Sequence, residues 1–208
     1  PQPVCCFVED HSGVLIFLDY KRHDMAFQLS RKWLVGAASA AVVAAAPFVT
    51  GWEGWRNTVY KDQGGVSTVC AGHTDRIGTE NITKQTYTNE ECGRILIKDL
   101  NKDEAQLRAS IGYDVPLTQG QEVILIDFVH NLGIGALNAG SLRPLLLRGD
   151  VNKACAKILE YKYARVGPGG SLQEVKGLRL RREAENRVCT GQTTVDQEAA
   201  LRGVILVN

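Results

Sequence analysis

The sequence predicts an α+β fold of two lobes, and three observations support that prediction. The segment from Glu53 to Ile82 is rich in glycine and threonine and holds short β-branched stretches, which is typical of short strands joined by turns. Apolar residues after Thr88 recur instead at helical intervals, and the helical pattern continues from Thr118 onward. A small lobe with a sheet, a connecting helix and a larger helical lobe would leave a cleft that suits a long polymeric substrate.

Capping residues mark where the first two of these helices begin. Thr88 and Glu91 have the spacing of a capping box, which predicts a connecting helix that ends at Gly112. Thr118 and Gln121 repeat that spacing before a strongly apolar helix.

Two further helices are expected in the C-terminal half. Asp150 is expected to cap a helix that runs through Tyr161. A Ser171–Glu174 box is expected to open a last, basic helix that ends near Cys189. Residues 192–208 are predicted to be a C-terminal tail.

The last helix carries five cations, for which three interpretations remain open. A solvated face, attraction to an anionic cell envelope and binding of nucleic acid are the candidates. No aromatic residues alternate with the cations, and the formal net charge is only +1, so no nucleic-acid partner is expected. The five cations are Lys176, Arg179, Arg181, Arg182 and Arg187.

A weak membrane segment precedes the small lobe. From Met25, the sole methionine, the sequence passes two cations, Arg31 and Lys32, and enters an uncharged run at residues 33–52. That order is typical of a membrane-targeting segment, and about 20 apolar residues suffice to cross a bilayer. We therefore expect translation to start at Met25, with residues 1–24 as an upstream or fusion segment and a signal-anchor over 25–52.

The apolar run itself has three possible fates. Small residues dominate it and Pro47 interrupts it, so its insertion free energy is marginal, which favours an uncleaved anchor that later leaves the bilayer. A signal peptide cleaved after Ala46 and a buried core helix are the alternatives. An anchor would keep Arg31 and Lys32 in the cytoplasm and place everything after Trp52 outside.

Two carboxylates, Glu53 and Asp62, stand at either end of the passage that follows the run. Glycoside hydrolysis usually needs two carboxyl groups, one protonated to donate to the leaving oxygen and one ionised to attack the sugar or order a water. Burial can keep the acid protonated near neutral pH. Pairs of acids are common, so this spacing alone is a weak indication.

The residues around the pair make the indication specific. Asp62 lies nine positions after Glu53 within a Tyr-Lys-Asp string, Thr68 follows six positions later, and a Gly-His pair closes the segment. This pattern resembles the active-site signature of the phage-type lysozymes, and the later strings FVHNLG, SLRPLL and GLRLRRE extend the resemblance over roughly residues 53–191. The resemblance implies a lysozyme-like two-lobed catalytic domain, and the N-terminal run is similar to that of signal-anchor-release endolysins.

Carried over to these positions, the resemblance implies a role for each residue. Glu53 would be the general acid, Asp62 would polarise or position the attacking water, and Thr68 would hydrogen-bond that water. An inverting mechanism follows from these roles, while a retaining mechanism with Asp62 as the nucleophile stays open.

Four further residues are expected to bind substrate or support the site: His73, Thr74, His130 and Ser141. His73 would brace the site through a hydrogen bond, because no second ligand lies at metal spacing, and neither a metal nor another cofactor is expected. His130 stands where this family often has an aromatic residue. A buried structural histidine is an equal alternative at that position.

Four cysteines follow the run, and an even number in an exported chain suggests disulfides. We expect Cys70 to pair with Cys92 in the small lobe and Cys155 with Cys189 between two C-terminal helices. Four reduced thiols are the alternative.

Together with these patterns, the resemblance implies a monomeric endolysin. It would cleave the β-1,4 bond between N-acetylmuramic acid and N-acetylglucosamine in peptidoglycan, tethered in the host inner membrane through residues 33–52 and then released to the periplasm. A non-catalytic wall-binding protein and a transglycosylase are the alternatives. The three residues Glu53, Asp62 and Thr68 weigh against the first, and Asp62 weighs against the second.

Overall fold

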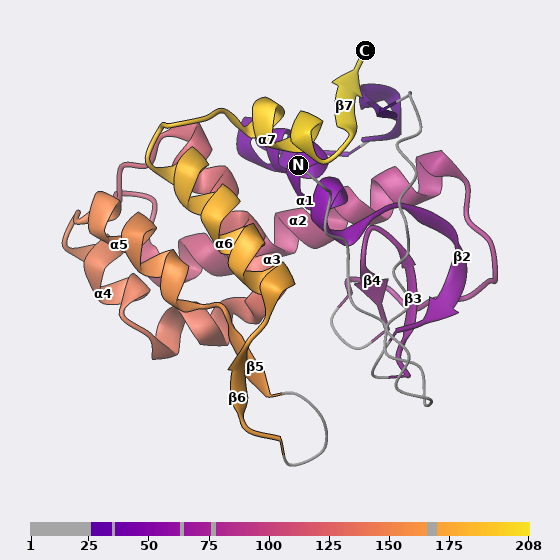
Figure 1. Ribbon diagram of the computed structural model, residues 1–208. Helices are drawn as coiled ribbons and strands as arrows, with labels where there is room; N and C mark the ends of the chain where they lie inside the picture. The colour runs from indigo at the N-terminus through magenta and orange to yellow at the C-terminus, as the bar shows by residue number, and fades with distance from the viewer. Residues whose placement is uncertain (1–25, 35, 63–64, 76–77, 166–169) are drawn as a thin grey trace.

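The computed structural model describes residues 26–34, 36–62, 65–75, 78–165 and 170–208. Within these ranges seven α-helices and three small sheets form the α+β fold that the sequence predicts (Figure 1). The expected upstream segment 1–24 and the start at Met25 lie outside the described residues.

The small lobe is built on a three-stranded antiparallel sheet in the order β2-β3-β4. Its strands are Arg56–Lys61 (β2), Ser67–Cys70 (β3) and His73–Thr74 (β4). A small apolar cluster that includes Val69 and Ile95 packs this sheet against the first turns of α2. The sheet therefore has its own core and is held to the helical lobe by one shared helix.

The connecting helix and the long helix after it begin where the sequence predicts. α2 spans Asn89–Ile111 and α3 spans Gln119–Ala139, and both capping boxes are formed. α3 bends at Gly133, whose φ of 78° lies in the left-handed region that favours glycine. The bend turns the second part of α3 away from the line of its first part.

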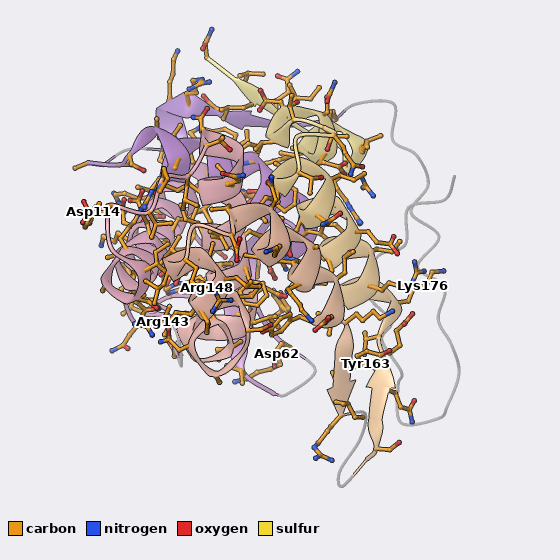
Figure 2. All side chains as sticks on the ribbon, turned by 90° about the vertical axis from the view of Figure 1, so that its left-hand side faces the viewer. Asp62, Asp114, Arg143, Arg148, Tyr163 and Lys176 are labelled. Carbon is orange, nitrogen blue, oxygen red and sulfur yellow. A yellow bond between two sulfur atoms is a disulfide. The ribbon has the colours of Figure 1, made fainter. Side chains whose placement is uncertain are left out.

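The remaining helices of the large lobe are α4 (Leu142–Leu147), α5 (Val151–Lys157), the short 3₁₀ helix η2 (Ile158–Glu160) and α6 (Lys176–Cys189). The predicted helix start at Ser171 is wrong. Residues Leu172–Glu174 form strand β6, which pairs with β5 (Tyr163–Arg165) as an antiparallel hairpin. The hairpin projects from the body of the molecule, with Tyr163 on it (Figure 2).

The apolar run and the C-terminal residues pack together. α1 spans Ala40–Glu53, and its inner face, which includes Val42, Ala45 and Phe48, is almost fully buried against α2, α3 and α7. Here most of the run forms a core helix. Residues 192–208, expected to be a tail, contain α7 (Val195–Leu201) and β7 (Val204–Val207).

The chain before α1 completes this end of the molecule. β1 (Phe27–Ser30) pairs in parallel with β7, and the 3₁₀ helix η1 (Arg31–Trp33) follows it. Figure 1 shows this N-terminal segment beside β7, at the opposite end from the β5–β6 hairpin.

One described helix, α3, is long and apolar enough to cross a membrane by length and composition, whereas α1 is apolar but shorter. α3 is the central helix of the fold: Ile124, Ile126 and Phe128 are inaccessible to solvent. The apolar composition of α3 is therefore explained by its burial in the core of the large lobe.

Both expected disulfides are formed. Cys70–Cys92 joins β3 to α2, and Cys155–Cys189 joins α5 to α6. Each lobe thus has one covalent link across its own packing interface.

Candidate active site

Glu53 is the last residue of α1 and lies at the junction of the two lobes. Gly54 ends the helix with a φ of 78°. The Glu53 side chain is 25% exposed, and its Oε1 accepts a hydrogen bond from Nη1 of Arg181 on α6 at 2.5 Å. One carboxylate oxygen is therefore held from the large lobe.

The other oxygen of Glu53 faces the small lobe at Gly72. Gly72 forms the turn between β3 and β4 with a φ of 76°, and a Cβ atom there would lie 3.1 Å from Oε2 of Glu53. Two features therefore favour glycine at position 72: the left-handed backbone conformation and the close approach of the Glu53 carboxylate.

Asp62 and Thr68 are positioned by a shared neighbour, Val66. The backbone N–H of Val66 donates to Oδ1 of Asp62 at 2.8 Å, and its carbonyl accepts from the Thr68 hydroxyl at 3.2 Å. Asp62 itself is half-buried at the end of β2, and Thr68 is buried in β3 opposite Tyr60. The hairpin therefore brings the second carboxylate and the hydroxyl to one place.

Arg181 links Glu53 to a second, fully buried carboxylate. Its Nη2 and Nε donate to the two oxygens of Asp127 on α3, at 2.6 and 3.1 Å. Burial alone would raise the pKa of Asp127, but the guanidinium of Arg181 outweighs it, so the pKa lies below its ordinary value. Asp127 is thus a permanent counter-charge that keeps Arg181 in place.

The three other arginines of α6 are also paired with carboxylates. Arg182 is fully buried and donates to Glu185 and Asn131. Arg179 contacts Glu174 and Glu183, and Arg187 contacts Glu198. The interpretation of this helix as one continuous basic face is therefore wrong for Arg181 and Arg182, which are buried, and remains open for Lys176, Arg179 and Arg187.

His73 is a brace between the small lobe and α2. Its Nδ1 lies 2.7 Å from Oδ2 of Asp99, and its Nε2 lies 2.9 Å from the carbonyl oxygen of Glu80. Burial would lower the pKa of His73, but the hydrogen bond and charge of Asp99 raise it above its ordinary value. His73 therefore makes hydrogen bonds to both segments, and its predicted role as a brace of the site stays a prediction.

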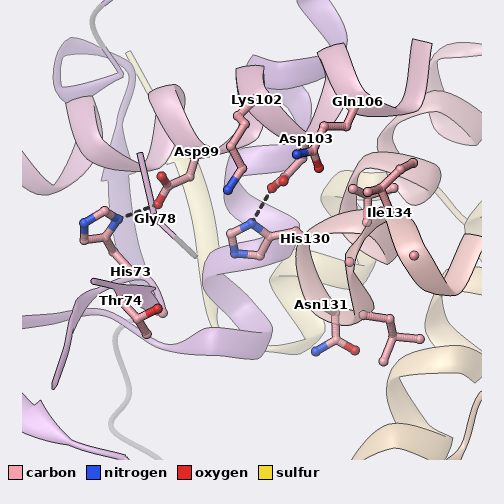
Figure 3. A pocket seen from close by; sticks show the side chains of 15 residues that line it. His73, Thr74, Gly78, Asp99, Lys102, Asp103, Gln106, His130, Asn131 and Ile134 are labelled. Atoms are coloured by element: carbon pink, nitrogen blue, oxygen red, sulfur yellow. Dashed lines mark hydrogen bonds and ion pairs between the residues drawn. The ribbon is translucent and has the colours of Figure 1, made fainter. Parts of the chain in front are cut away.

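His130 faces a cavity of about 560 Å³ between the β3–β4 turn, α2 and the bend of α3. Figure 3 shows two histidine–aspartate pairs on this cavity: His73 with Asp99 and His130 with Asp103, with Lys102 between the aspartates. The His130 Nδ1 lies 2.8 Å from Asp103 Oδ2. Burial alone would lower the pKa of His130. The hydrogen bond to Asp103 and the negative charge of Glu53 outweigh burial, so the pKa lies above its ordinary value.

The two remaining predicted residues lie in different surroundings. Thr74 is buried, pairs with Thr68 in the sheet and lines the cavity. Ser141 is exposed at the N-terminus of α4 and is not among the residues that line the cavity. The structure therefore gathers His73, Thr74 and His130 at the lobe junction and leaves Ser141 outside it.

Arg181 and Asp127 are site residues that the sequence reasoning missed. Arg181 is one of the five cations of the predicted basic helix, and Asp127 lies in the apolar helix after Thr118. The signal for Asp127 was its position inside the apolar string VILIDFV, because a carboxylate in such a string is buried and needs a cationic partner.

Comparisons with known proteins agree with this geometry. The family described as "Phage lysozyme" matches residues 50–185. A SAR-endolysin of Bacteriophage PS119 is 35% identical over 172 residues, which cover 79% of this chain and 96% of that protein. A SAR-endolysin of Enterobacteria phage PA-2 is 39% identical over 140 residues, which cover 67% of this chain and 78% of that protein.

Comparison with a solved structure supports the lysozyme-like fold. The endolysin from Escherichia coli O157:H7 phage FAHEc1 has a TM-score of 0.63 to this chain at 21% identity, with 76% of this chain and 96% of that one covered. At this identity the likeness concerns the fold alone.

The fold has two lobes with a cavity at their junction, a glutamate between them and a second carboxylate on the small-lobe hairpin. These features agree with the class of muramidases, which are glycoside hydrolases. The chain belongs to the phage lysozyme family, in its SAR-endolysin subgroup. It is a peptidoglycan-hydrolysing endolysin, and its action lyses the host cell.

Proposed function

We propose that the enzyme cleaves the β-1,4 bond between N-acetylmuramic acid and N-acetylglucosamine, with Glu53 as the general acid. The observation that supports this role most directly is the place of Glu53 at the lobe junction, between Arg181 and the turn at Gly72. The hydrogen bond from Arg181 and the closeness of the Gly72 turn restrict the orientation of the carboxyl group, as proton donation to the leaving oxygen requires.

Asp62 and Thr68 are proposed to orient the attacking water. One oxygen of Asp62 is occupied by the Val66 N–H, while among the described residues no partner engages the other oxygen. The Thr68 hydroxyl is held by the Val66 carbonyl and retains its lone pairs as acceptors. A water bound by both groups would attack opposite the leaving group and invert the anomeric configuration.

His130 and Thr74 are proposed to contact the sugar residues. The Nδ1 side of His130 is bonded to Asp103, so Nε2 is left for a ligand in the cavity. With the pKa raised, Nε2 carries a proton more often and donates to a sugar hydroxyl or acetamido oxygen. Ser141 is the weakest of the proposed contacts, because it lies outside the cavity.

The chemical test is the variant Glu53→Gln, which preserves shape but removes the proton donor. General acid catalysis typically contributes about 10²–10⁴-fold, so hydrolysis of purified peptidoglycan should fall by at least about 100-fold in a variant that remains folded by circular dichroism. Glu183→Gln is the matched control, since that carboxylate is partly exposed and forms a surface ion pair with Arg179. Undiminished hydrolysis by Glu53→Gln would remove Glu53 from the mechanism.

Product analysis separates the remaining alternatives. Reducing ends on N-acetylmuramic acid, released with inverted configuration in early NMR spectra, are expected. Retained configuration would make Asp62 the nucleophile, anhydro-sugar ends would indicate a transglycosylase, and no products at all would indicate a wall-binding protein.

We further propose that residues 33–52 tether the protein in the host inner membrane before it acts in the periplasm. The apolar, charge-free composition of that run and the SAR-endolysin name of its relatives support the proposal. Since Val42, Ala45 and Phe48 fill the core of the folded enzyme, the same residues cannot lie in lipid and complete the core at once. A tethered chain therefore lacks α1 in the core and, with it, the position of Glu53.

A further inference from the structure

Strand β1 precedes the apolar run and pairs with a strand from the other end of the chain. The register places Phe27 beside Val204 and Ser30 beside Val207, and the N–H of Phe27 donates to the carbonyl of Gly203 at 2.6 Å. Leu29 is fully buried in this pairing and Val204 almost so. The contact is thus a packed strand pair and not a loose end.

The C-terminal segment 195–207, which holds α7 and β7, also contacts the last turn of α1. The guanidinium of Arg202 lies 3.2 Å from the centre of the Trp52 ring, and a Cβ atom on Gly51 would come within 2.9 Å of the Arg202 Cβ. Together with the β1 pairing, the segment contacts the chain on both sides of the apolar run.

The residues between β1 and α1 pack against α2 and the start of the small lobe. A Cβ atom on Gly93 of α2 would lie 2.1 Å from the Trp33 carbonyl oxygen, so only glycine leaves room for that backbone. The Trp33 ring stacks on Trp55 at 6.1 Å, and the Asn101 amide donates to the Ala37 carbonyl at 2.9 Å. The folded domain therefore has specific contacts for the residues that immediately precede the apolar run.

The tether proposed above places the two strands on opposite sides of the bilayer. The cations Arg31 and Lys32 follow β1 directly and would be held in the cytoplasm, whereas β7 lies after the run and would be outside. β1 and β7 cannot pair across a membrane, so the strand pair belongs to the released form only.

We infer that the segment 195–207 is a docking surface for β1, that β1 reaches it only after crossing the bilayer with Arg31 and Lys32, and that the pairing holds the enzyme in its released form. The inference rests on the proposed membrane tether and goes beyond it, because it names the part of the domain that captures the transferred residues.

Cross-linking tests where β1 lies. Gln28 and Ile205 are exposed partners in the register, so Gln28→Cys with Ile205→Cys, in a chain with Cys5 and Cys6 changed to serine, should be joined by a short membrane-permeant bis-maleimide. The cross-link is expected in the soluble fraction and not in the membrane fraction. A cross-link in the membrane fraction, or its absence from active soluble enzyme, overturns the inference.

The matched control is Gln28→Cys with Leu172→Cys, because Leu172 is exposed on the β5–β6 hairpin at the other end of the molecule. No cross-link is expected with this pair in either fraction. A chain that never fractionates with membranes would contradict the tether itself, and the catalytic assignment is tested separately by Glu53→Gln.

A second pair of variants tests the holding role. Val204→Ala with Leu206→Ala weakens the packing of β7, and the ratio of soluble to membrane-bound protein should fall several-fold. Leu201→Ala, at a residue that is 74% exposed, should leave the ratio unchanged. Unchanged specific activity of the soluble portion on purified peptidoglycan reports an intact fold, and an unchanged ratio with the double variant overturns the holding role.

Discussion

Arg181 is the residue at which the charges of the site balance. It lies between Glu53, the proposed general acid, and Asp127, which is fully buried and has a lowered pKa. Because Asp127 compensates the charge of the guanidinium, Arg181 is held as a hydrogen-bond donor to Glu53. The charge of Arg181 is thus balanced by a carboxylate other than the one proposed to react.

Asp127→Asn should therefore be costly although Asp127 does not touch substrate. Removing one partner of a buried ion pair typically lowers the free energy of unfolding by about 3–5 kcal/mol. Urea unfolding measures the loss, and Glu183→Gln at the exposed pair with Arg179 should cost at most about 1 kcal/mol. Equal losses in the two variants would contradict a compensating role for Asp127.

The His73–Asp99 pair should make stability depend on pH in a defined window. The pKa of His73 is raised above 6.5, so its contribution is complete below that value and disappears as pH rises through the folded-state pKa. Burial would raise the pKa of Asp99, but the hydrogen bond from His73 lowers it below 3.8, so its contribution disappears as pH falls through that lowered pKa.

His73→Gln tests this window. The stability difference between the wild type and the variant should be largest between pH 3.8 and 6.5 and should shrink on either side. Denaturant unfolding at a series of pH values measures it. A difference that stays constant from pH 3 to pH 9 would show that the histidine acts only through packing.

Candidate site residues could be proposed from the sequence where reactive side chains stand at a recognisable spacing. The buried ion-pair partners could not be predicted in this way. Glu53, Asp62 and Thr68 lie within one short segment, so their spacing is visible in the string. Asp127 and Arg181 are 54 positions apart, and the sequence around either residue does not indicate which residue is its ion-pair partner.

At the scale of elements, the β3–β4 turn carries a testable constraint on the site. Gly72 and Gly191 have nearly the same φ, 76° and 75°, but a Cβ atom would meet Glu53 only at Gly72 and would meet nothing within 4 Å at Gly191. A left-handed backbone costs a non-glycine residue about 1–2 kcal/mol at either position.

Gly72→Ala and Gly191→Ala should therefore lose similar stability but differ in activity. We expect hydrolysis of peptidoglycan by Gly72→Ala to fall by about tenfold or more, because the new methyl group displaces the Glu53 carboxylate, a shift of about 1.4 kcal/mol in the barrier. Gly191→Ala should retain nearly full activity. Similar activity in the two variants would show that the turn does not position Glu53.

Elements with local start signals could be predicted, and those that depend on distant pairing could not. The capping boxes at Thr88 and Thr118 act within one turn of helix, and both predicted starts are correct. The same spacing at Ser171 failed, because residues 172–174 find a strand partner in residues 163–165. For β1 and β7 the partners are separated by almost the whole chain, and a parallel pair leaves no hairpin turn to mark it.

At the scale of the whole molecule, the apolar run has to satisfy two environments with one composition. In the fold its inner face is buried, and Ala45 and Ala46 are inaccessible to solvent, so larger residues there would have to displace their neighbours. In lipid the same alanines contribute little, which keeps insertion marginal. The small residues therefore serve both tight packing in the enzyme and weak retention in the bilayer.

Positions of the run that stay accessible in the folded enzyme separate these two effects. Ala37 and Ala40 are exposed and Ala44 is half-buried, so leucine at all three should leave the fold and the activity on purified peptidoglycan nearly unchanged. The three leucines would favour insertion by about 1–2 kcal/mol in total. The released fraction should therefore fall by about 5- to 30-fold, measured by separating membrane and soluble protein, and lysis of the host should be delayed.

Serine at the same three positions is the matched control, because it preserves small size while it weakens insertion, and it should advance release. If the leucine variant lyses cells on the wild-type schedule while tethered protein persists in the membrane fraction, release does not govern activity. Normal activity of that variant on purified peptidoglycan would ensure that such a result concerns the membrane and not a damaged core.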